Sequence, residues 1–477
     1  MPDEAKIPKG RIRRSAKLGS IIGTQGARYA GTKAANVARS EEEGKQALEA
    51  RHLETAMKMV GALGQMKGAA MKLGQFASFI DTEFIPEEYR EIYQEQLGKL
   101  RNEAPAMPWE QVVKVLEEEY DGEPLSEYFT EIEHEAFAAA SIGQVHRAEL
   151  LDGRKVAVKI QYPGIAEAME ADLRNAGTIV RLARAIAPGL DAKAIAEEIR
   201  ERMMEELDYE YEAQNQRIFS RAYRDHPFIY VPEVVTRISR RRVLVTEFVE
   251  GIDFDAIKEL PHEERSRFGE IVFRGSLGSM FNLQHFNADP HPGNFILMED
   301  GRVAFLDFGM TKKLDHEQIV LEQRAFDAAS RDDPEDFRKA LHDLGFIKNP
   351  SKLDAERLLE HMRAVGGWYI EDREIEISAK RVMKIIESTN DPRSEYYDLM
   401  RREAMPADEL MGRRMEIGVV AVLGQLGAKR NWHRIMREWI YADAPATPLG
   451  EEEWEYFEGR GVMQMPIIER SLEGEQR

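Results

Sequence analysis

The chain has 477 residues, of which 43% are hydrophobic and 32% are charged, and its formal net charge is −20. A chain of this length and composition can bury a large core and suggests about three domain-sized units. It contains no Cys, which excludes disulfides, thiolate metal sites, iron–sulfur clusters and a Cys nucleophile, and fits a reducing compartment.

The charge is unevenly distributed along the chain. Residues 1–39 hold nine Lys and Arg against two Asp and Glu, a local net charge of +7, which leaves −27 for the rest. An acidic body argues against extended contact with nucleic-acid phosphates, so no nucleic-acid partner is expected. The basic segment is expected to bind reversibly to an anionic membrane surface. It lacks the apolar core and cleavage site of a secretory signal.

No membrane-spanning segment is expected from the sequence. The longest run without Asp, Glu, Lys or Arg, residues 275–288, has 14 residues, whereas a spanning helix needs about 20 apolar residues. We therefore expect a cytoplasmic protein that can associate peripherally with a membrane.

The N-terminal part is predicted to be helical. Residues 41–80 keep an apolar period close to that of an α-helix, and residues 86–100 and 109–120 continue the pattern around a break at Pro105 and Pro108. Before them, small side chains recur at every fourth position, on one helix face: Gly19, Gly23, Ala27, Gly31 and Ala35.

From about residue 130 the pattern changes to that of short strands. Residues 144–150 and 154–160 flank Asp152-Gly153, a strong hairpin signal. Two helices, two strands, a helix and a second hairpin are predicted to follow in this order: residues 165–187, 192–221, 228–236, 242–249, 263–283 and 295–306. After Asp307 the chain is predicted to be wholly helical to about residue 442, and the last 30 residues to be loosely held.

A strand carries the first candidate functional side chain. Alternation along Val156-Ala157-Val158-Lys159 puts the two Val on one face and Ala157 with Lys159 on the other. A Lys beside a small residue can reach a nucleotide phosphate while the Ala leaves room for the base. A single exposed Lys on a strand does not by itself indicate a nucleotide site, so the interpretation of Lys159 depends on the other motifs.

Two later segments offer ligands for Mg²⁺ and a group to orient a nucleophile. The loop Asp289-Pro290-His291-Pro292-Gly293-Asn294 places a carboxylate for the nucleophile at Asp289 and an amide oxygen for the cation at Asn294. Asp307, in Asp307-Phe308-Gly309 after the second hairpin, can serve as the main Mg²⁺ ligand.

An acidic helical segment, residues 205–212, could supply a partner for Lys159. Asp208 and Glu212 are expected one turn apart on one helix face, whereas Glu206 projects elsewhere. The alternative for this segment is a solvated helix face.

The order Lys, acidic helix, Asp-loop-Asn and Asp-Phe-Gly predicts a protein-kinase-like site for ATP and Mg²⁺. The strand with Glu247, Phe248 and Val249 fits the one that leads into an interlobe hinge, where its backbone would read the adenine edge and Gly251 would let the chain turn. The predicted fold class is α+β and bilobal, with a small antiparallel sheet in the N-lobe, a helical C-lobe, an N-terminal helical extension and an all-helical C-terminal region.

Several departures from an ordinary protein kinase are visible. The loop before the first hairpin is Ala-rich rather than Gly-rich, and Cβ atoms there keep the backbone from approaching phosphate closely: Ala138, Ala139, Ala140 and Ser141. There is no H-R-D and no A-P-E, and Lys312 and Lys313 lead almost directly into helical sequence. Phosphorylation of protein substrates is therefore disfavoured.

From about residue 53 to residue 313 the chain resembles the UbiB/AarF atypical kinase-like proteins, also described as the coenzyme Q kinase-like family. The resemblance rests on Lys72-Leu73-Gly74-Gln75 as the K-x-G-Q signature, the Ala-rich loop, Lys159, Glu206 with Asp208 as the E-x-D motif, Glu212, Asp289, Asn294 and Asp307.

The resemblance implies more than the motifs themselves. Lys72 and Gln75 would meet Glu206 and Asp208 where a protein substrate would otherwise lie, and Glu212 would pair with Lys159. The implied activity is ATP binding with slow hydrolysis, or phosphotransfer to a small acceptor, in support of isoprenoid-quinone or lipid metabolism. A lipid or isoprenoid is thus an implied partner. Quinone-linked members often carry C-terminal spanning helices, and none is predicted here.

The expected layout follows these motifs. It comprises a basic segment (1–40), a helical extension with K-x-G-Q (41–125), an N-lobe (126–250), the start of the C-lobe with the catalytic and metal loops (251–345), a helical region (346–445) and an acidic tail (446–477). Two functional alternatives remain open. One is a small-molecule kinase of the choline or aminoglycoside type, whose loop pattern Asp289-x-His291-x-x-Asn294 matches; the other is a nucleotide-sensing scaffold without catalysis.

Overall fold

The structure is a computed structural model, and it describes residues 107–140, 142–167, 169–170, 197, 200–201, 203–390, 394–396, 399, 406 and 409–460. The predictions for residues 1–106, with Lys72 and Gln75, and for Ser141 lie outside the described residues. The chain divides into two compact units. The first comprises the described residues within Met1–Gly153 and Val158–Ile179, and the second those within Arg154–Ala157 and Val180–Arg477.

The first unit is built on an antiparallel sheet. After α5 (Trp109–Glu119) and a 3-10 turn, Leu125–Glu127, come β1 (Phe129–Ile132), β2 (Ala138–Ala139), β3 (Gly143–Leu150) and β4 (Lys155–Gln161). β3 lies between β1 and β4 and also pairs with β2. β3 and β4 confirm the predicted hairpin.

The predicted alternation along β4 is also confirmed. Val156, Val158 and Ile160 are buried, whereas Ala157 and Lys159 are half-buried. Period-2 alternation of this kind places one face of the strand against the core and leaves the other face accessible.

In the second unit the acidic segment is not one helix. α8 (Tyr209–Ala222) begins after Asp208, whose carboxylate caps it by accepting a hydrogen bond from the N–H of Glu210 at 3.0 Å. Glu206 belongs to the helical turn before this break and is buried. The expected shared helix face for Asp208 and Glu212 is therefore wrong, because an Asp side chain is more favourable as a cap than inside a helix.

The strand predicted over residues 228–236 is much shorter than expected. β5 (Ile229–Tyr230) pairs in parallel with β9 (Val303–Phe305), which pairs antiparallel with β8 (Phe295–Leu297). Pro232 follows closely, and a proline cannot donate to a strand ladder. β8 and β9 confirm the second hairpin. β6 (Val243–Glu247) follows β4 in strand order, and the first residues of β4 belong to this unit.

A long helical stretch follows, as predicted for residues 263–283. After α9 (Phe254–Ile257), it runs through α10 (His262–Phe273), a π turn (Arg274–Gly278) and α11 (Ser279–Asn282). The later helices are α12 (His316–Ser330), α13 (Pro334–Asp343), α14 (Ala355–Ile370), α15 (Ala379–Asn390), α17 (Leu410–Leu426), α18 (Trp432–Tyr441) and α19 (Pro448–Gly459). None of the helices among the described residues is long and apolar enough to cross a bilayer.

The region after Asp307 is not wholly helical. It includes β10 (Thr311–Lys313) and a small antiparallel pair, β11 (Ile375–Glu376) with β12 (Lys429–Arg430). Runs of two or three residues are too short to leave a periodic signal in the sequence.

A buried arginine ties α19 to the core. The guanidinium of Arg274 is fully buried and contacts the carboxylates of Glu270 at 3.0 Å, Glu438 at 2.8 Å and Glu453 at 2.8 Å. Glu453 lies on α19, and a buried cation needs such carboxylates. The expectation that the last residues are loosely held is therefore wrong for Pro448–Gly459.

Gly251 lies at a bend of the chain, as expected, and it also meets another backbone segment closely. The N–H of Ile252 donates to the C=O of Leu297 at 2.9 Å, and the reverse bond measures 3.0 Å. A Cβ on Gly251 would lie 2.3 Å from the oxygen of Leu297. The position needs glycine because two backbones approach closely there.

Gly251→Ala should therefore lower the free energy of unfolding by about 1–3 kcal/mol, the usual effect of overpacking. Urea unfolding followed by circular dichroism measures it. Gly412→Ala is the matched control, because no atom lies within 4 Å of its added Cβ and Ala favours a helix by up to about 1 kcal/mol. Equal unfolding midpoints for the two variants would contradict this account.

A buried histidine should make stability depend on pH. His226 accepts hydrogen bonds at Nδ1 from the N–H groups of Phe228 and Ile229. Burial, and then the charges of Arg274 and Arg460, lower the pKa of His226 from 6.5 to about 3. Between these values the unfolded chain binds a proton that the folded chain does not. The free energy of unfolding should thus fall as the pH drops from 6.5 towards 3, by up to about 1.4 kcal/mol per pH unit.

His226→Gln removes the titrating group, so its stability should depend less on pH over this range. Unfolding midpoints measured at several pH values test this, with the exposed His342→Gln as control. A pH slope that His226→Gln leaves unchanged would refute the assignment.

Candidate functional site

Two short strand pairs in the second unit bring the predicted loops together. β7 (His285–Asn287) pairs antiparallel with β10, and β8 pairs antiparallel with β9. The loop Asp289–Asn294 connects β7 to β8, and the segment Asp307–Gly309 connects β9 to β10. Because both connections join the same two strand pairs, they lie side by side. The N–H of Leu306 donates to the C=O of Asn294 at 3.0 Å, and that of Ala288 to Met310 at 2.8 Å.

Asn287 bridges the two loops with its side-chain amide. Its Nδ2 donates to the backbone C=O of Asp307, and its Oδ1 accepts from the N–H of Asp289 at 2.9 Å. One half-buried side chain therefore fixes the backbone of both aspartates.

Asp289 is held from several sides. Its C=O accepts from Asn294 Nδ2 at 3.1 Å and from the N–H of His291 at 2.7 Å. Its carboxylate Oδ1 lies 2.8 Å from Nη2 of Arg414, on α17. Of the two amide atoms of Asn294 only Oδ1 has lone pairs for a cation, and the bond from Nδ2 to the Asp289 C=O fixes the orientation of that amide.

Asp307 lies beside the acidic end of α8. Its Oδ1 accepts from the N–H of Gly309 at 2.9 Å. A Cβ on Gly309 would lie 3.6 Å from Oε2 of Glu212 and 3.3 Å from Oδ1 of Asp307. Two carboxylates thus flank Gly309, and such a pair attracts a cation.

Phe308 holds this segment against α8. Its C=O accepts from Nδ2 of Asn215 at 3.3 Å, and its ring lies 4.9 Å from that of Phe219. Phe219 also contacts His285, at 4.8 Å between ring centroids. Burial, and then the charge of Lys313, lower the pKa of His285 to about 4, so it is neutral at pH 7.

The other predicted residues are divided between the units. Lys159 and the Ala-rich loop lie in the first unit, where Ala138 and Ala139 pair with β3 and the N–H of Ala140 donates to Gly143 at 2.9 Å. Glu206, Asp208 and Glu212 lie in the second. The pairing of Lys159 with Glu212 stays a prediction.

In the strand predicted to read the adenine edge, most of the polar groups already form hydrogen bonds with other protein groups. The side chain of Glu247 accepts from the hydroxyl of Tyr230 at 2.7 Å and the N–H of Glu233 at 2.9 Å. The N–H groups of Glu247 and Phe248 donate to Glu233 and Lys155. Among the described residues, the N–H of Val249 has no protein acceptor.

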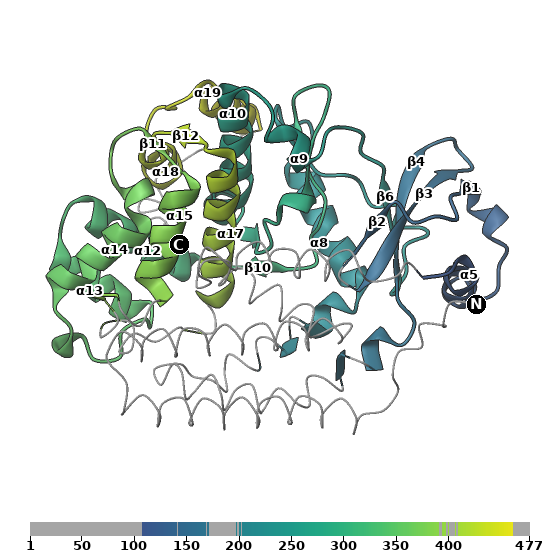
Figure 1. The fold of residues 1–477 in the computed structure, drawn as a ribbon, viewed down its shortest axis with the longest axis horizontal. Helices are drawn as coiled ribbons and strands as arrows, with labels where there is room; N and C mark the ends of the chain where they lie inside the picture. Colours follow the sequence, from purple (N-terminus) through teal and green to yellow (C-terminus); the bar gives the residue numbers. More distant parts are fainter. Residues whose placement is uncertain are drawn as a thin grey trace, which may run out of the picture. The chain divides into compact units, whose positions relative to one another are not determined.

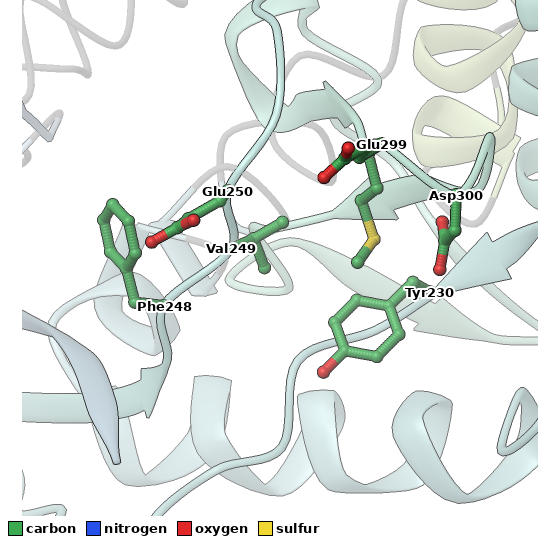
Figure 2. A pocket seen from close by; sticks show the side chains of 7 residues that line it. Tyr230, Phe248, Val249, Glu250, Glu299 and Asp300 are labelled. Carbon is green, nitrogen blue, oxygen red and sulfur yellow. The ribbon is translucent and has the colours of Figure 1, made fainter. Parts of the chain in front are cut away.

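A pocket of about 470 Å³ adjoins this strand. Figure 2 shows Phe248, Val249 and Glu250 on one side and Tyr230, Glu299 and Asp300 on the other. It contains none of the loop residues Asp289, Asn294 and Asp307. Three carboxylates line it, of which Glu250 is paired with Lys155 and Asp300 with Arg302, each at 2.7 Å.

The donor set of the two loops suits a hard cation. The described residues contain no group of three or more His, Asp or Glu side chains placed to hold a metal. Asp307 and Asn294 offer a carboxylate and an amide oxygen, the kind of ligand that Mg²⁺ takes together with water and substrate phosphates.

Two residues of the site were missed in the sequence. Asn287 stands two positions before Asp289, and this closeness in sequence to a predicted site residue was the one available signal. Arg414 is 125 positions away from Asp289 and next to a second arginine, and nothing in the local pattern distinguishes it.

The fold and these loops define a protein of the kinase-like class, with an antiparallel sheet followed by a helical region. A model of the ABC1 atypical kinase-like domain matches residues 99–341, and the chain belongs to this family. The family resemblance found in the sequence is confirmed.

The relatives agree with this assignment. The chain is 32% identical over 354 residues to zebrafish (Danio rerio) "Atypical kinase COQ8B, mitochondrial", covering 72% of this chain and 55% of the relative. It is 34% identical over 272 residues to Arabidopsis thaliana "Protein ACTIVITY OF BC1 COMPLEX KINASE 1, chloroplastic". That match covers 55% of this chain and 39% of the relative. It thus spans about half the length, or less, of these curated relatives.

A solved structure confirms the fold. The chain is similar to Rv3197 of Mycobacterium tuberculosis, solved in complex with erythromycin, with 32% identity and a TM-score of 0.61. The match covers 83% of this chain and 98% of the other.

Asn287→Ala should loosen both loops. It removes two hydrogen bonds of about 1 kcal/mol each, so the free energy of unfolding should fall by about 2 kcal/mol. Amide hydrogen exchange should become faster in peptides that cover residues 285–294 and 306–313. Asn349→Ala is the control, because Asn349 is exposed and makes no capping hydrogen bond. Unchanged exchange in both peptides would contradict the bridging role.

Proposed function

We propose that this protein binds ATP with Mg²⁺ and hydrolyses it slowly or transfers its terminal phosphate to a small, non-peptide acceptor. The observation that supports this most strongly is the gathering of Asp289, Asn294, Asp307 and Glu212 by two strand pairs and one helix of the second unit. This set has the residue types that phosphoryl transfer requires.

Asp307 and Asn294 are proposed to hold the Mg²⁺. Their oxygens match its preference for hard ligands. A bound Mg²⁺ would supply neutralising charge to the phosphates. Both side chains are fixed by backbone contacts, so little reorganisation would be needed on binding.

Asp289 is proposed to orient the nucleophile, either water or a small hydroxyl compound, and to accept its proton. Lys159 is proposed to bind phosphate, with Glu212 as its carboxylate partner. Lys72, Gln75, Glu206 and Asp208 are proposed to restrict the acceptor side, as the family resemblance implies. A restricted acceptor side favours water or a small molecule over a protein substrate.

The N–H of Val249 is proposed to read the adenine edge. Those of Glu247 and Phe248 already have acceptors, so they are less suited to this role. The Ala-rich loop, Ala138–Ala140 with Ser141, is proposed to cover the phosphates. In this loop the N–H of Ala140 already donates to the C=O of Gly143, whereas the amides of a glycine-rich loop are exposed.

The acceptor is proposed to come from isoprenoid-quinone or lipid metabolism. This rests on the family resemblance and on the relative whose name is COQ8B. The basic segment over residues 1–39 is proposed to bring the protein to an anionic membrane surface.

Phosphate release from Mg²⁺-ATP tests the proposal, with and without vesicles that contain anionic phospholipid. Asp307→Asn should lower the rate by about 100-fold or more, because it removes a charged ligand of the proposed Mg²⁺ site. Asp372→Asn is the matched control, since Asp372 pairs with Arg434 at the surface. No turnover in either condition, or equal rates for wild type and Asp307→Asn, would refute the proposal.

A further inference from the structure

The C-terminal helix α17 contributes a side chain to the site. Arg414 is buried, with 7% of its side chain exposed, and Asp289 is 14% exposed. Nη2 of Arg414 and Oδ1 of Asp289 are 2.8 Å apart, although 125 positions separate them in sequence. A guanidinium and a carboxylate at this distance form a charge-assisted hydrogen bond, which is short and strong.

α17 is a rigid support for this contact. It packs against α10, the π turn and α15, and Figure 1 shows it running beside α10. Met411, Met415 and Val419 are fully buried on it. A helix held on several sides delivers its side chains with little freedom.

A second ionic cluster fixes the rotation of α17. The neighbouring Arg413 contacts Glu322 of α12 at 3.0 Å and Glu416 at 2.7 Å. Successive residues on a helix point about 100° apart. Because the side chain of Arg413 is paired with Glu322 of α12, the side chain of Arg414 points in a different direction, towards the Asp289 loop.

The contact makes the two oxygens of Asp289 unequal. Oδ1 already accepts from Arg414, so Oδ2 is the oxygen with the greater remaining capacity to accept a hydrogen bond from a nucleophile. Without the guanidinium, the carboxylate could rotate about its last bond and present either oxygen in several directions.

We propose that Arg414 is a positioning residue for Asp289, fixing the orientation of its carboxylate towards the nucleophile. The helical region after residue 346 is then part of the active site rather than an appended support. This inference rests on the proposed function, because it assigns Asp289 its role there.

A double-mutant cycle tests the inference with Arg414→Met, Asp289→Asn and the double variant. Arg414→Met should lower kcat for ATP hydrolysis by about 10- to 100-fold, the effect expected of a misplaced catalytic group. KM for ATP should change less than about 3-fold, because Arg414 acts through Asp289. In the Asp289→Asn background the same change should have little further effect on kcat. Arg414→Lys, which keeps the charge, should recover part of the loss.

The unfolding midpoint of the nucleotide-free protein gives a second readout. The two single changes should not be additive, since each breaks the same contact. Arg434→Met is the matched control, because Arg434 and Asp372 are also 2.8 Å apart but lie at the surface; it should leave kcat unchanged.

Three results would overturn the inference while leaving the proposed function intact. They are an equal loss of kcat from Arg414→Met in both backgrounds, a gain in kcat, which would mean that the contact inhibits, and additive unfolding midpoints. If wild type and Asp307→Asn release phosphate equally, the proposed function itself fails, and the inference fails with it.

Discussion

The site depends on two short antiparallel strand pairs, β7 with β10 and β8 with β9. They hold the Asp289 loop beside the Asp307 segment through backbone hydrogen bonds, and the side-chain amide of Asn287 joins the two segments. The resulting arrangement is a fixed anionic position that a cation and a phosphate chain could share, which is why the proposed function rests on it.

The helical part of the second unit is organised by buried arginines. Arg274 joins α10, α18 and α19 through three carboxylates, and Arg413 joins α17 to α12. A buried guanidinium without its carboxylates would be very costly, so each pair fixes how the helices are rotated. Arg414 extends this organisation to Asp289. The same kind of interaction that holds the helices therefore also reaches the loop that is proposed to be catalytic.

Family membership and the local structure agree on how this protein departs from ordinary protein kinases. Ala138 and Ala139 form a strand paired with β3, and the N–H of Ala140 is used within its own turn. A short β10 then leads from Gly309 to α12, with no long segment between them in which a peptide could dock. These features support the proposal that the acceptor is water or a small molecule rather than a protein.

The sequence by itself determined the fold class, the family, both hairpins and the pairing of an Asp-loop-Asn with Asp-Phe-Gly. These follow from local alternation, Asp-Gly turns and fixed motif spacing, which act over a few residues. It misjudged the acidic segment, where Asp208 caps a helix, and α19, which Arg274 holds. The tertiary structure alone decided that Asn287 bridges two loops, that Gly251 touches the backbone of Leu297 and that Arg414 reaches Asp289. Such contacts join residues far apart in the chain, and no local pattern records which distant side chain packing brings into place.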